Sequence, residues 1–310
     1  KLVSKIDYYY NLNISRAILI EDVNKTLSDY KDENDITVFM KNKNDLGYYL
    51  AGLLEGDGHI SLPSLGVITL NRVLNPRIVF TSHVNNLGMY AFIQTELGNI
   101  GRFQASGNNV LRYIIGDMKG IIYFINLIHG KLKTAKNKRF NDLIKFINAK
   151  YSLTIPESLL DNTNYKENSW FAGFTESDGH FGIKYIESRP KSEICKRSVS
   201  KNISIKFRLD QRAYDKPTST CMRPFMEDLA SFLSCNLKSY TNNTNSEVLS
   251  LTVSNISNIK FIVDYFNRYP LIGNKLNDFK KWEIVYNMIV SKEHLSEEGR
   301  LKIRALINKL

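Results

Sequence analysis

Two short segments of the chain place acidic residues, glycine and histidine in the same order. The first reads GLLEGDGH over residues 52–59, and the second reads GFTESDGH over residues 173–180. Carboxylates such as Asp57 and Asp178 bind divalent cations, and Mg²⁺ prefers one or two carboxylates together with waters and substrate phosphates. Two such sites could activate water for in-line attack on phosphodiesters. These residues therefore predict metal-assisted phosphodiester hydrolysis, provided that the fold brings the two aspartates together.

The two segments are copies of each other at a single offset of 121 residues. Six of the nine positions in 51–59 are identical to those in 172–180, without a gap. A match of this length, with one copy in each half, indicates an internal duplication of about half the chain.

A second pair of similar segments lies downstream of the two motifs. Lys136 matches Lys275 and Phe140 matches Phe279, both at an offset of 139 residues. The larger offset requires about 18 additional residues in the second half, and the polar stretch 187–201 is a natural place for them, as a long hairpin.

Each motif reads as the end of a short apolar helix in which small residues recur four positions apart. These residues are Gly52, Gly56, Ser169, Gly173 and Ser177. Residues at this spacing share one helix face. Glycine inside a helix costs ~1 kcal/mol relative to alanine, and close contact between two helices compensates for that cost. We therefore expect the motif helices to pack as parallel neighbours, with Asp57 and Asp178 close together at one end. For Glu55 and Glu176 we favour capping or hydrogen bonding in the interface.

The composition favours a polyanionic partner. The 310 residues include 42 Lys and Arg against 31 Asp and Glu, which gives a formal charge of +11. Such a surplus is typical of proteins that bind nucleic acid or an acidic surface. No run reaches the ~18 to 20 apolar residues of a membrane span, so we expect no membrane partner. The three cysteines form no CxxC pair, which argues against a thiolate zinc site and a disulfide framework.

The alternation of β-branched residues with Asn and Gly turns predicts the order αββαββα in each half. The fold class is therefore α+β, with two pseudo-symmetric lobes and antiparallel sheets. The predicted divisions are an N-terminal extension at 1–44, a first lobe at 45–150, a linker at 151–167, a second lobe at 168–290 and a C-terminal helix at 291–310.

The duplicated motif resembles the LAGLIDADG signature, and residues 46–290 resemble a two-motif, single-chain LAGLIDADG homing endonuclease or intron-encoded maturase. The resemblance implies that the acids at Asp57 and Asp178 bind Mg²⁺ (or Mn²⁺) and act in catalysis, with backbone carbonyls of Gly56 and Ser177 as further metal ligands. Thr175 and Ser177 depart from the signature, because they are polar where it is apolar or small.

The family also carries a basic residue before the last helix of each lobe, near the scissile phosphate, and Lys136 and Lys275 match that place. A polar residue on a strand that faces the DNA helps to order solvent. Gln211 fits this role, with His83 as a weaker counterpart. For His59 and His180, hydrogen bonding or DNA contact is favoured over a role as a base.

The resemblance further implies that the two curved sheets form a saddle over double-stranded DNA. Basic residues on or beside the strands would contact base edges and phosphates. These candidates are Arg72, Arg77, Arg102, Arg112, Lys184, Lys206, Arg208 and Lys238. Two non-identical lobes predict a monomer that reads an asymmetric target.

The preferred hypothesis is a site-specific DNA homing endonuclease that makes a staggered double-strand break. The alternative is an RNA maturase that assists splicing of a group I intron, with that intron RNA as its partner and with or without DNA cleavage. A third hypothesis is a DNA-binding regulator that does not cut. The bias toward Lys, Asn, Ile and Tyr, whose codons are AT-rich, fits an organelle genome, and we expect a mitochondrial location.

Overall fold

The computed structural model describes residues 42–63, 75–107, 109–189, 198 and 200–307. The described residues fall into two compact units. The first contains residues up to Ser177 together with Asp215–Thr220 and Tyr269–Asn274, and the second contains Asp178–Tyr214, Cys221–Arg268 and the residues from Lys275 onward. Of the predicted N-terminal extension, only residues 42–44 are described.

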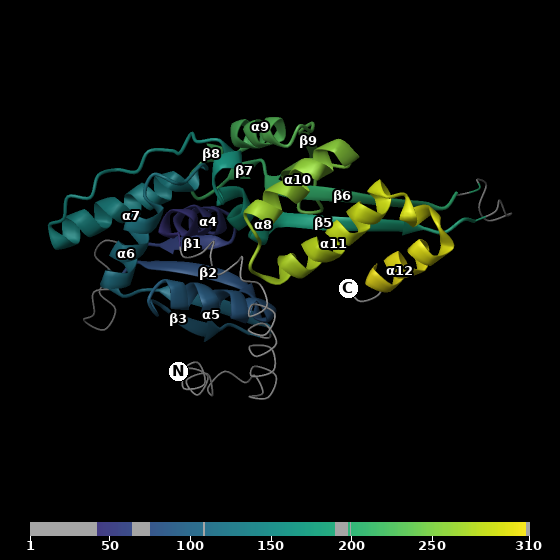
Figure 1. Ribbon diagram of the computed structural model, residues 1–310. Helices are drawn as coiled ribbons and strands as arrows, with labels where there is room; N and C mark the ends of the chain where they lie inside the picture. The colour runs from purple at the N-terminus through teal and green to yellow at the C-terminus, as the bar shows by residue number, and fades with distance from the viewer. Residues whose placement is uncertain (1–41, 64–74, 108, 190–197, 199, 308–310) are drawn as a thin grey trace. The chain divides into compact units, whose positions relative to one another are not determined.

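The first unit is built on an antiparallel sheet with the strand order β1-β2-β4-β3 (Figure 1). Its elements, in chain order, are α4 (Lys43–Gly56), β1 (Gly58–Ser61), β2 (Arg77–His83), the 3-10 turn η2 (Val84–Asn86), α5 (Leu87–Glu96), β3 (Arg102–Ala105), β4 (Val110–Ile115), α6 (Met118–Ile128), α7 (Lys136–Tyr151), the 3-10 turn η3 (Tyr165–Glu167) and α8 (Trp170–Asp178), of which all but Asp178 belong to this unit.

Helices α5 and α6 cover one face of this sheet. Phe80 on β2 contacts Tyr90 on α5 and Phe124 on α6, with ring centroids 5.9 and 6.1 Å apart. Residues alternate between the two faces of a strand, and on β4 the exposed Arg112 lies between buried Leu111 and Tyr113. The sheet therefore has one apolar face against helices and one face that carries polar side chains.

The second unit repeats this plan with the strand order β5-β6-β10-β9. Its elements are β5 (Gly179–Ile186), β6 (Asn202–Arg212), the short paired strands β7 (Tyr214–Asp215) and β8 (Thr220–Cys221), α9 (Arg223–Phe232), β9 (Lys238–Thr241), β10 (Glu247–Val253), α10 (Ile256–Arg268), α11 (Asn274–Val290), the 3-10 turn η4 (Glu293–Leu295) and α12 (Glu297–Ile307). Of these residues, Asp215, Thr220 and Asn274 are assigned to the first unit.

Aromatic rings fill the core of the second unit. Phe181 on β5 contacts Phe207 on β6, Phe266 on α10 and both Phe279 and Trp282 on α11. Phe207 and Phe279 are fully buried or nearly so. The apolar residues of α10 and α11 thus cover one face of the sheet, as α5 and α6 do in the first unit.

The predicted order αββαββα is confirmed in both halves. Residues 291–310 were predicted as one C-terminal helix, but the helix α12 begins only at Glu297. Before it, Lys292 has a left-handed backbone with φ of 62°, which ends the preceding helical segment. The hydroxyl of Ser296 then accepts a hydrogen bond from Gly299 N, which caps the start of α12. Within the described residues, no helix is both long and apolar enough to cross a membrane.

Candidate functional site

The motif helices α4 and α8 pack together at their glycines, within the first unit. A Cβ atom at Gly52 would overlap the carbonyl oxygen of Trp170 and would lie 2.7 Å from Phe174 N. A Cβ atom at Gly173 would overlap the carbonyl oxygen of Tyr49 in the same way. The expected close contact between the two helices is therefore present, and only glycine fits at these two positions.

A pair of crossed hydrogen bonds joins the same helices. Trp170 Nε1 donates to Glu55 Oε2 at 2.6 Å, and Tyr49 Oη donates to Glu176 Oε2 at 2.9 Å. Tyr49 and Trp170 are related by the offset of 121 residues, as are the two glutamates. Both glutamates are buried, so their expected role in the helix interface is confirmed.

Glu55 also fixes the segment that leads into α7. Its carboxylate accepts hydrogen bonds from Lys133 N, from Thr134 N and from the Thr134 hydroxyl. Burial raises the pKa of Glu55, and these hydrogen bonds act in the opposite direction. In the second copy, Glu176 accepts from Ile272 N at 3.2 Å. Lys133 and Ile272 are related by the second offset of 139 residues, so each motif glutamate binds the backbone at the corresponding place.

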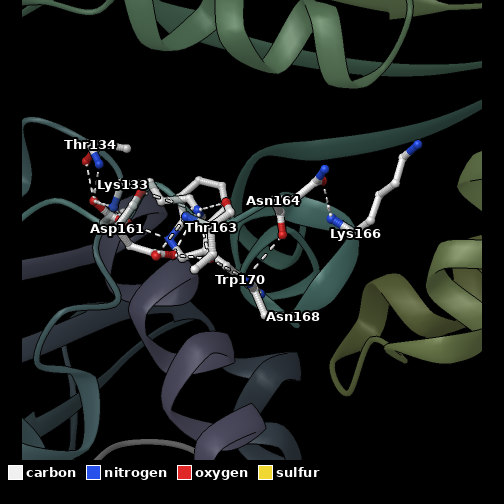
Figure 2. Close-up of polar contacts among 9 residues, drawn as sticks. Lys133, Thr134, Asp161, Thr163, Asn164, Lys166, Asn168 and Trp170 are labelled. Carbon is white, nitrogen blue, oxygen red and sulfur yellow. Dashed lines mark hydrogen bonds and ion pairs between the residues drawn. The ribbon is translucent and has the colours of Figure 1, made fainter.

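The side chain of Lys133 ties the predicted linker to this segment (Figure 2). Its ammonium group forms a buried ion pair with Asp161 at 2.8 Å and donates to the carbonyl oxygen of Thr163 at 2.5 Å. Asn168 Nδ2 donates to the Thr163 hydroxyl, and Trp170 N donates to Asn168 Oδ1. These bonds connect the residues before α7 with the start of α8, and so set the position of the second motif helix in the first unit.

Asp57 is the C-cap residue that directly follows the first motif helix, and it is half-buried. Its amide nitrogen contacts the carbonyl oxygens of Leu53 and Leu54 and donates to the Ser177 hydroxyl at 3.2 Å. Ser177, which is polar where the signature has a small or apolar residue, therefore accepts a hydrogen bond from the turn that carries Asp57.

The ammonium group of Lys136 lies at the carboxyl end of α4. It donates to the carbonyl oxygens of Leu54 and Glu55 at 2.9 Å and of Gly58 at 2.7 Å, and lies 3.4 Å from that of Gly56. A cation at this end of a helix is favourable, because the carbonyl dipoles point toward it. It balances the acidic end of the motif helix, where Glu55 and Asp57 oppose that dipole.

His59 follows on β1, exposed at the edge of the same region. Arg139 Nε donates to the carbonyl oxygen of Ile60 at 3.2 Å. Burial lowers the pKa of His59, and the positive charges of Lys136 and Arg139 lower it further. Sequence reasoning did not single out Arg139, although its place one turn after Lys136 could have indicated it.

In the second unit, Gln211 lies next to the second motif aspartate. Gln211 Nε2 donates to Asp178 Oδ2 at 2.8 Å. By strand alternation Gln211 shares a side with the buried Leu209, and its role in ordering solvent stays a prediction. It reaches the aspartate from the end of β6.

The sheet register identifies the counterpart of Gln211 in the first unit. Gly179 pairs with Leu209, whereas Gly58 pairs with Phe80. Two residues further along β2 is Ser82, which directly precedes the candidate His83; the role of His83 stays a prediction. The Ser82 hydroxyl donates to the His83 carbonyl oxygen, and the His83 ring accepts from Asn85 N.

The second predicted basic residue, Lys275, lies in the first turn of α11. Asp278 follows one turn later and was not singled out from the sequence. Burial raises the pKa of the Asp278 carboxyl, and the positive charges of Lys281, Lys275 and His180 partly oppose that rise.

The basic strand residues lie on the polar faces of the two sheets. Arg77, Arg102 and Arg112 are exposed in the first unit, and the alternation of their strands places them on its uncovered face. Exposed candidates in the second unit are Lys184, Lys206 and Lys238, while Arg208 is partly buried. Arg208 forms an ion pair with Asp210 at 2.8 Å and contacts the ring of Tyr240. Arg72 lies outside the described residues.

The predicted metal ligands suit a cation that needs few protein groups. Among the described residues there is no cluster of three or more His, Cys, Asp or Glu side chains able to hold a metal ion. A site with carboxylate and carbonyl oxygens fits Mg²⁺, which completes its shell with waters and phosphates. Asp57 belongs to the first unit and Asp178 to the second, and their proximity stays a prediction.

Comparison with known proteins matches both halves of the chain. Residues 50–147 and 171–286 match the family described as LAGLIDADG endonuclease. An uncharacterized cox1 intron-2 protein of Schizosaccharomyces pombe is 26% identical over 269 residues, covering 85% of this chain and 72% of that protein. The intron-encoded DNA endonuclease aI3 of Saccharomyces cerevisiae is 26% identical over 295 residues, covering 82% and 68%.

Solved structures show the same fold. The LAGLIDADG homing endonuclease I-SmaMI, in a crystal structure with cleaved DNA, aligns with a TM-score of 0.63 at 22% identity, covering 84% of this chain and 95% of that one. Each matched segment begins within a motif helix and includes the sheet that follows it. With both copies matched and the fold shared, this chain belongs to the LAGLIDADG endonuclease family.

Proposed function

We propose that this chain is a site-specific homing endonuclease that makes a staggered double-strand break at a long asymmetric DNA target. The observation that carries this proposal is the family match across both halves, with an aspartate retained at the end of each motif helix. The exposed arginines on the uncovered sheet face of the first unit support DNA as the partner, because such side chains bind phosphates and base edges.

In this proposal, Asp57 and Asp178 hold the divalent cations, with the backbone carbonyls of Gly56 and Ser177 as further ligands. Mg²⁺ or Mn²⁺, when bound, would polarise a phosphate oxygen and lower the pKa of a bound water. In each cut, the water oxygen bonds to phosphorus, one ester bond from phosphorus to oxygen breaks, and the departing sugar oxygen gains a proton.

The chain's own residues orient this chemistry. Gln211 holds the Asp178 carboxylate through its hydrogen bond, and Lys136 secures the turn that carries Asp57. In this proposal, Lys275 acts near the scissile phosphate of its half-site. The two lobes, 45–150 and 168–290, read different half-sites as a single chain, so the target is not a palindrome.

We also propose that the chain is encoded in a mitochondrial intron. The similarity to a protein of a cox1 intron supports this origin, as does the bias toward residues with AT-rich codons.

The decisive experiment is cleavage selection from a randomised duplex library in Mg²⁺, followed by assay of the recovered target. The double variant Asp57→Asn, Asp178→Asn should bind this target within about threefold of the wild type and cut neither strand. Asp264→Asn, on the exposed side of α10, is the matched control and should cut normally. Undiminished cleavage by the double variant contradicts the assignment.

A further inference from the structure

Three side chains form a closed network on the polar face of the second sheet. Asp210 lies two residues after Arg208 on β6, so both side chains lie on the same face. Arg208 Nε donates to Asp210 Oδ1 at 2.9 Å, and Arg208 Nη2 forms the ion pair with Asp210 Oδ2 at 2.8 Å. Tyr240 on β9 completes the network, because its hydroxyl accepts from Arg208 Nη2 at 3.2 Å and donates to Asp210 Oδ2 at 3.3 Å.

Stability alone does not account for an acidic residue at this place. The side chains of Arg208 and Asp210 are 35% and 33% exposed, and ion pairs between such exposed groups contribute little to folding. By the sheet register, the other Lys, Arg, Asp and Glu residues on this face of the described strands are all basic, namely Lys184, Lys206, Arg212 and Lys238. A carboxylate among them weakens the attraction of the face for phosphates, so we looked for a role that compensates for this cost.

Asp210 orients the guanidinium group without using all of its donors. The carboxylate binds the edge formed by Nε and Nη2, and Nη1 has no hydrogen-bond partner among the described residues. The end of the planar fork, formed by Nη1 and Nη2, is therefore directed away from Asp210. The ring of Tyr240 lies beside the same group, with its centroid 5.6 Å from Arg208 Cζ. An arginine held in this way loses little conformational freedom when it binds a partner.

The end of the fork matches one base edge in the major groove. Guanine presents two acceptors there, N7 and O6, which a guanidinium group binds with two parallel hydrogen bonds. Adenine presents one acceptor and one amino donor, and that donor would face a second donor. To bind guanine, Arg208 Nη2 would give up its contact of 3.2 Å with the Tyr240 hydroxyl, which keeps its own bond to Asp210.

We infer that Arg208, fixed by Asp210 and Tyr240, recognises one guanine of the DNA target, and that Asp210 and Tyr240 are positioning residues for base specificity. The exposed lysines on this face, Lys184, Lys206 and Lys238, contribute affinity without base choice, because an ammonium group on a flexible stem binds phosphate as a point charge. This inference rests on the proposed function for its DNA partner, but not on cleavage.

The test selects duplexes by binding, from a randomised library and without divalent cations, so that cleavage does not enter. The wild type should recover a half-site with one guanine whose replacement by adenine weakens binding by about 10- to 100-fold. Arg208→Ala should lose this preference at that base pair alone. Tyr240→Phe keeps the ring but loses both hydrogen bonds, and should reduce the preference by a smaller factor.

Asp210→Asn gives the most specific readout. This variant should reduce the guanine preference to less than about threefold, because the fork is no longer fixed. It should also raise the affinity for random duplex DNA, because a carboxylate leaves the basic face. A residue with a merely structural role would not move these two quantities in opposite directions.

Two variants serve as controls. Asp264→Asn removes the same charge from an exposed ion pair on α10 and should change neither the guanine preference nor the affinity for random DNA. Lys206→Ala should weaken binding to all sequences by a similar factor.

The outcomes separate this inference from the function on which it rests. A guanine preference that Arg208→Ala and Asp210→Asn both remove supports the inference. If the same duplex is then not cut by the wild type in Mg²⁺, only the proposed nuclease activity is contradicted. Base preferences that neither variant changes overturn the inference, as does a wild type that recovers no preferred sequence. A preference for cytosine that is lost in Asp210→Asn but kept in Arg208→Ala overturns it as well.

Discussion

Trp170 donates its indole N–H to the carboxylate of Glu55, across the interface of the two motif helices, at 2.6 Å. The mirror contact from Tyr49 to Glu176 is 2.9 Å long. Since both glutamates are buried, these bonds satisfy charges that would otherwise be costly inside the protein. The helix pair is consequently held by directional bonds as well as by close backbone packing.

Substitution of the interface glycine should test that packing. Gly52→Ala would place a methyl group against the backbone of Trp170 and Phe174, so we expect a loss of about 3 kcal/mol in the free energy of unfolding. Gly116→Ala is the control, because its Cβ would meet only Arg77 Cγ, at 3.7 Å. Urea titration measures both, and equal stabilities would contradict the packing described for α4 and α8.

Removal of the Lys136 ammonium should loosen the end of α4. Lys136→Met leaves the carbonyl oxygens of Leu54, Glu55 and Gly58 without this donor, and we expect a loss of about 1 to 3 kcal/mol in the free energy of unfolding. Lys138→Met, two residues later and bound only to the Thr220 hydroxyl in the described contacts, should lose much less. A Lys136→Met protein of full stability that fails to cut DNA would instead favour a purely catalytic role.

Gln211→Met should slow cleavage without weakening DNA binding. The variant keeps the length of the side chain but removes the hydrogen bond to Asp178. Partners that orient a metal-binding carboxylate typically contribute 10- to 100-fold to activity, so we expect a fall of roughly tenfold. Single-turnover cleavage and equilibrium binding separate the two effects, and a variant with normal cleavage would show that Asp178 needs no such support.

The stability of the chain should depend on pH through Asp278. Burial raises the pKa of this carboxyl above its ordinary value of 3.8, so the folded state binds the proton more tightly than the unfolded state. The contribution of Asp278 to stability therefore falls as the pH rises from about 3.8 through the raised value, and is constant above it. Unfolding of wild type and Asp278→Asn between pH 4 and 7 checks this, since the variant lacks the titrating group. A stability difference that is independent of pH would refute it.

The polar sheet face should bind DNA in a salt-dependent manner. Arg112 is exposed at the centre of the first sheet, and Arg112→Ala should reduce the slope of log affinity against log salt by about one unit if it contacts a phosphate. Lys260→Ala, on the exposed side of α10, should leave the slope unchanged. Identical slopes for the two variants would remove Arg112 from the interface.

The sequence was sufficient for the architecture because the duplication repeats every local signal. Small residues four positions apart predicted the contact between α4 and α8. The close approach of the Trp170 backbone to Gly52 confirms that contact.

The sequence was less informative about partners that depend on register and side-chain reach. The sheet register places Ser82, and not the candidate His83, at the position equivalent to Gln211, and a shift of one residue moves a side chain to the opposite face of a strand. The buried Ile78 and Phe80 fix that register. Likewise, nothing in the residue types indicated that the Lys136 ammonium would bind backbone carbonyl groups, because this contact arises only when α7 crosses the end of α4.

The crossed bonds between the motif helices also limit how the molecule can be rebuilt. Tyr49 and Glu55 come from one copy of the ancestral gene and Trp170 and Glu176 from the other, yet all four side chains serve the same compact unit. A chimaera that exchanges one copy for that of a distant homologue would lose the match between hydrogen-bond donors and acceptors at the interface of the two motif helices. Successful grafts will therefore need to carry these four positions across as a set.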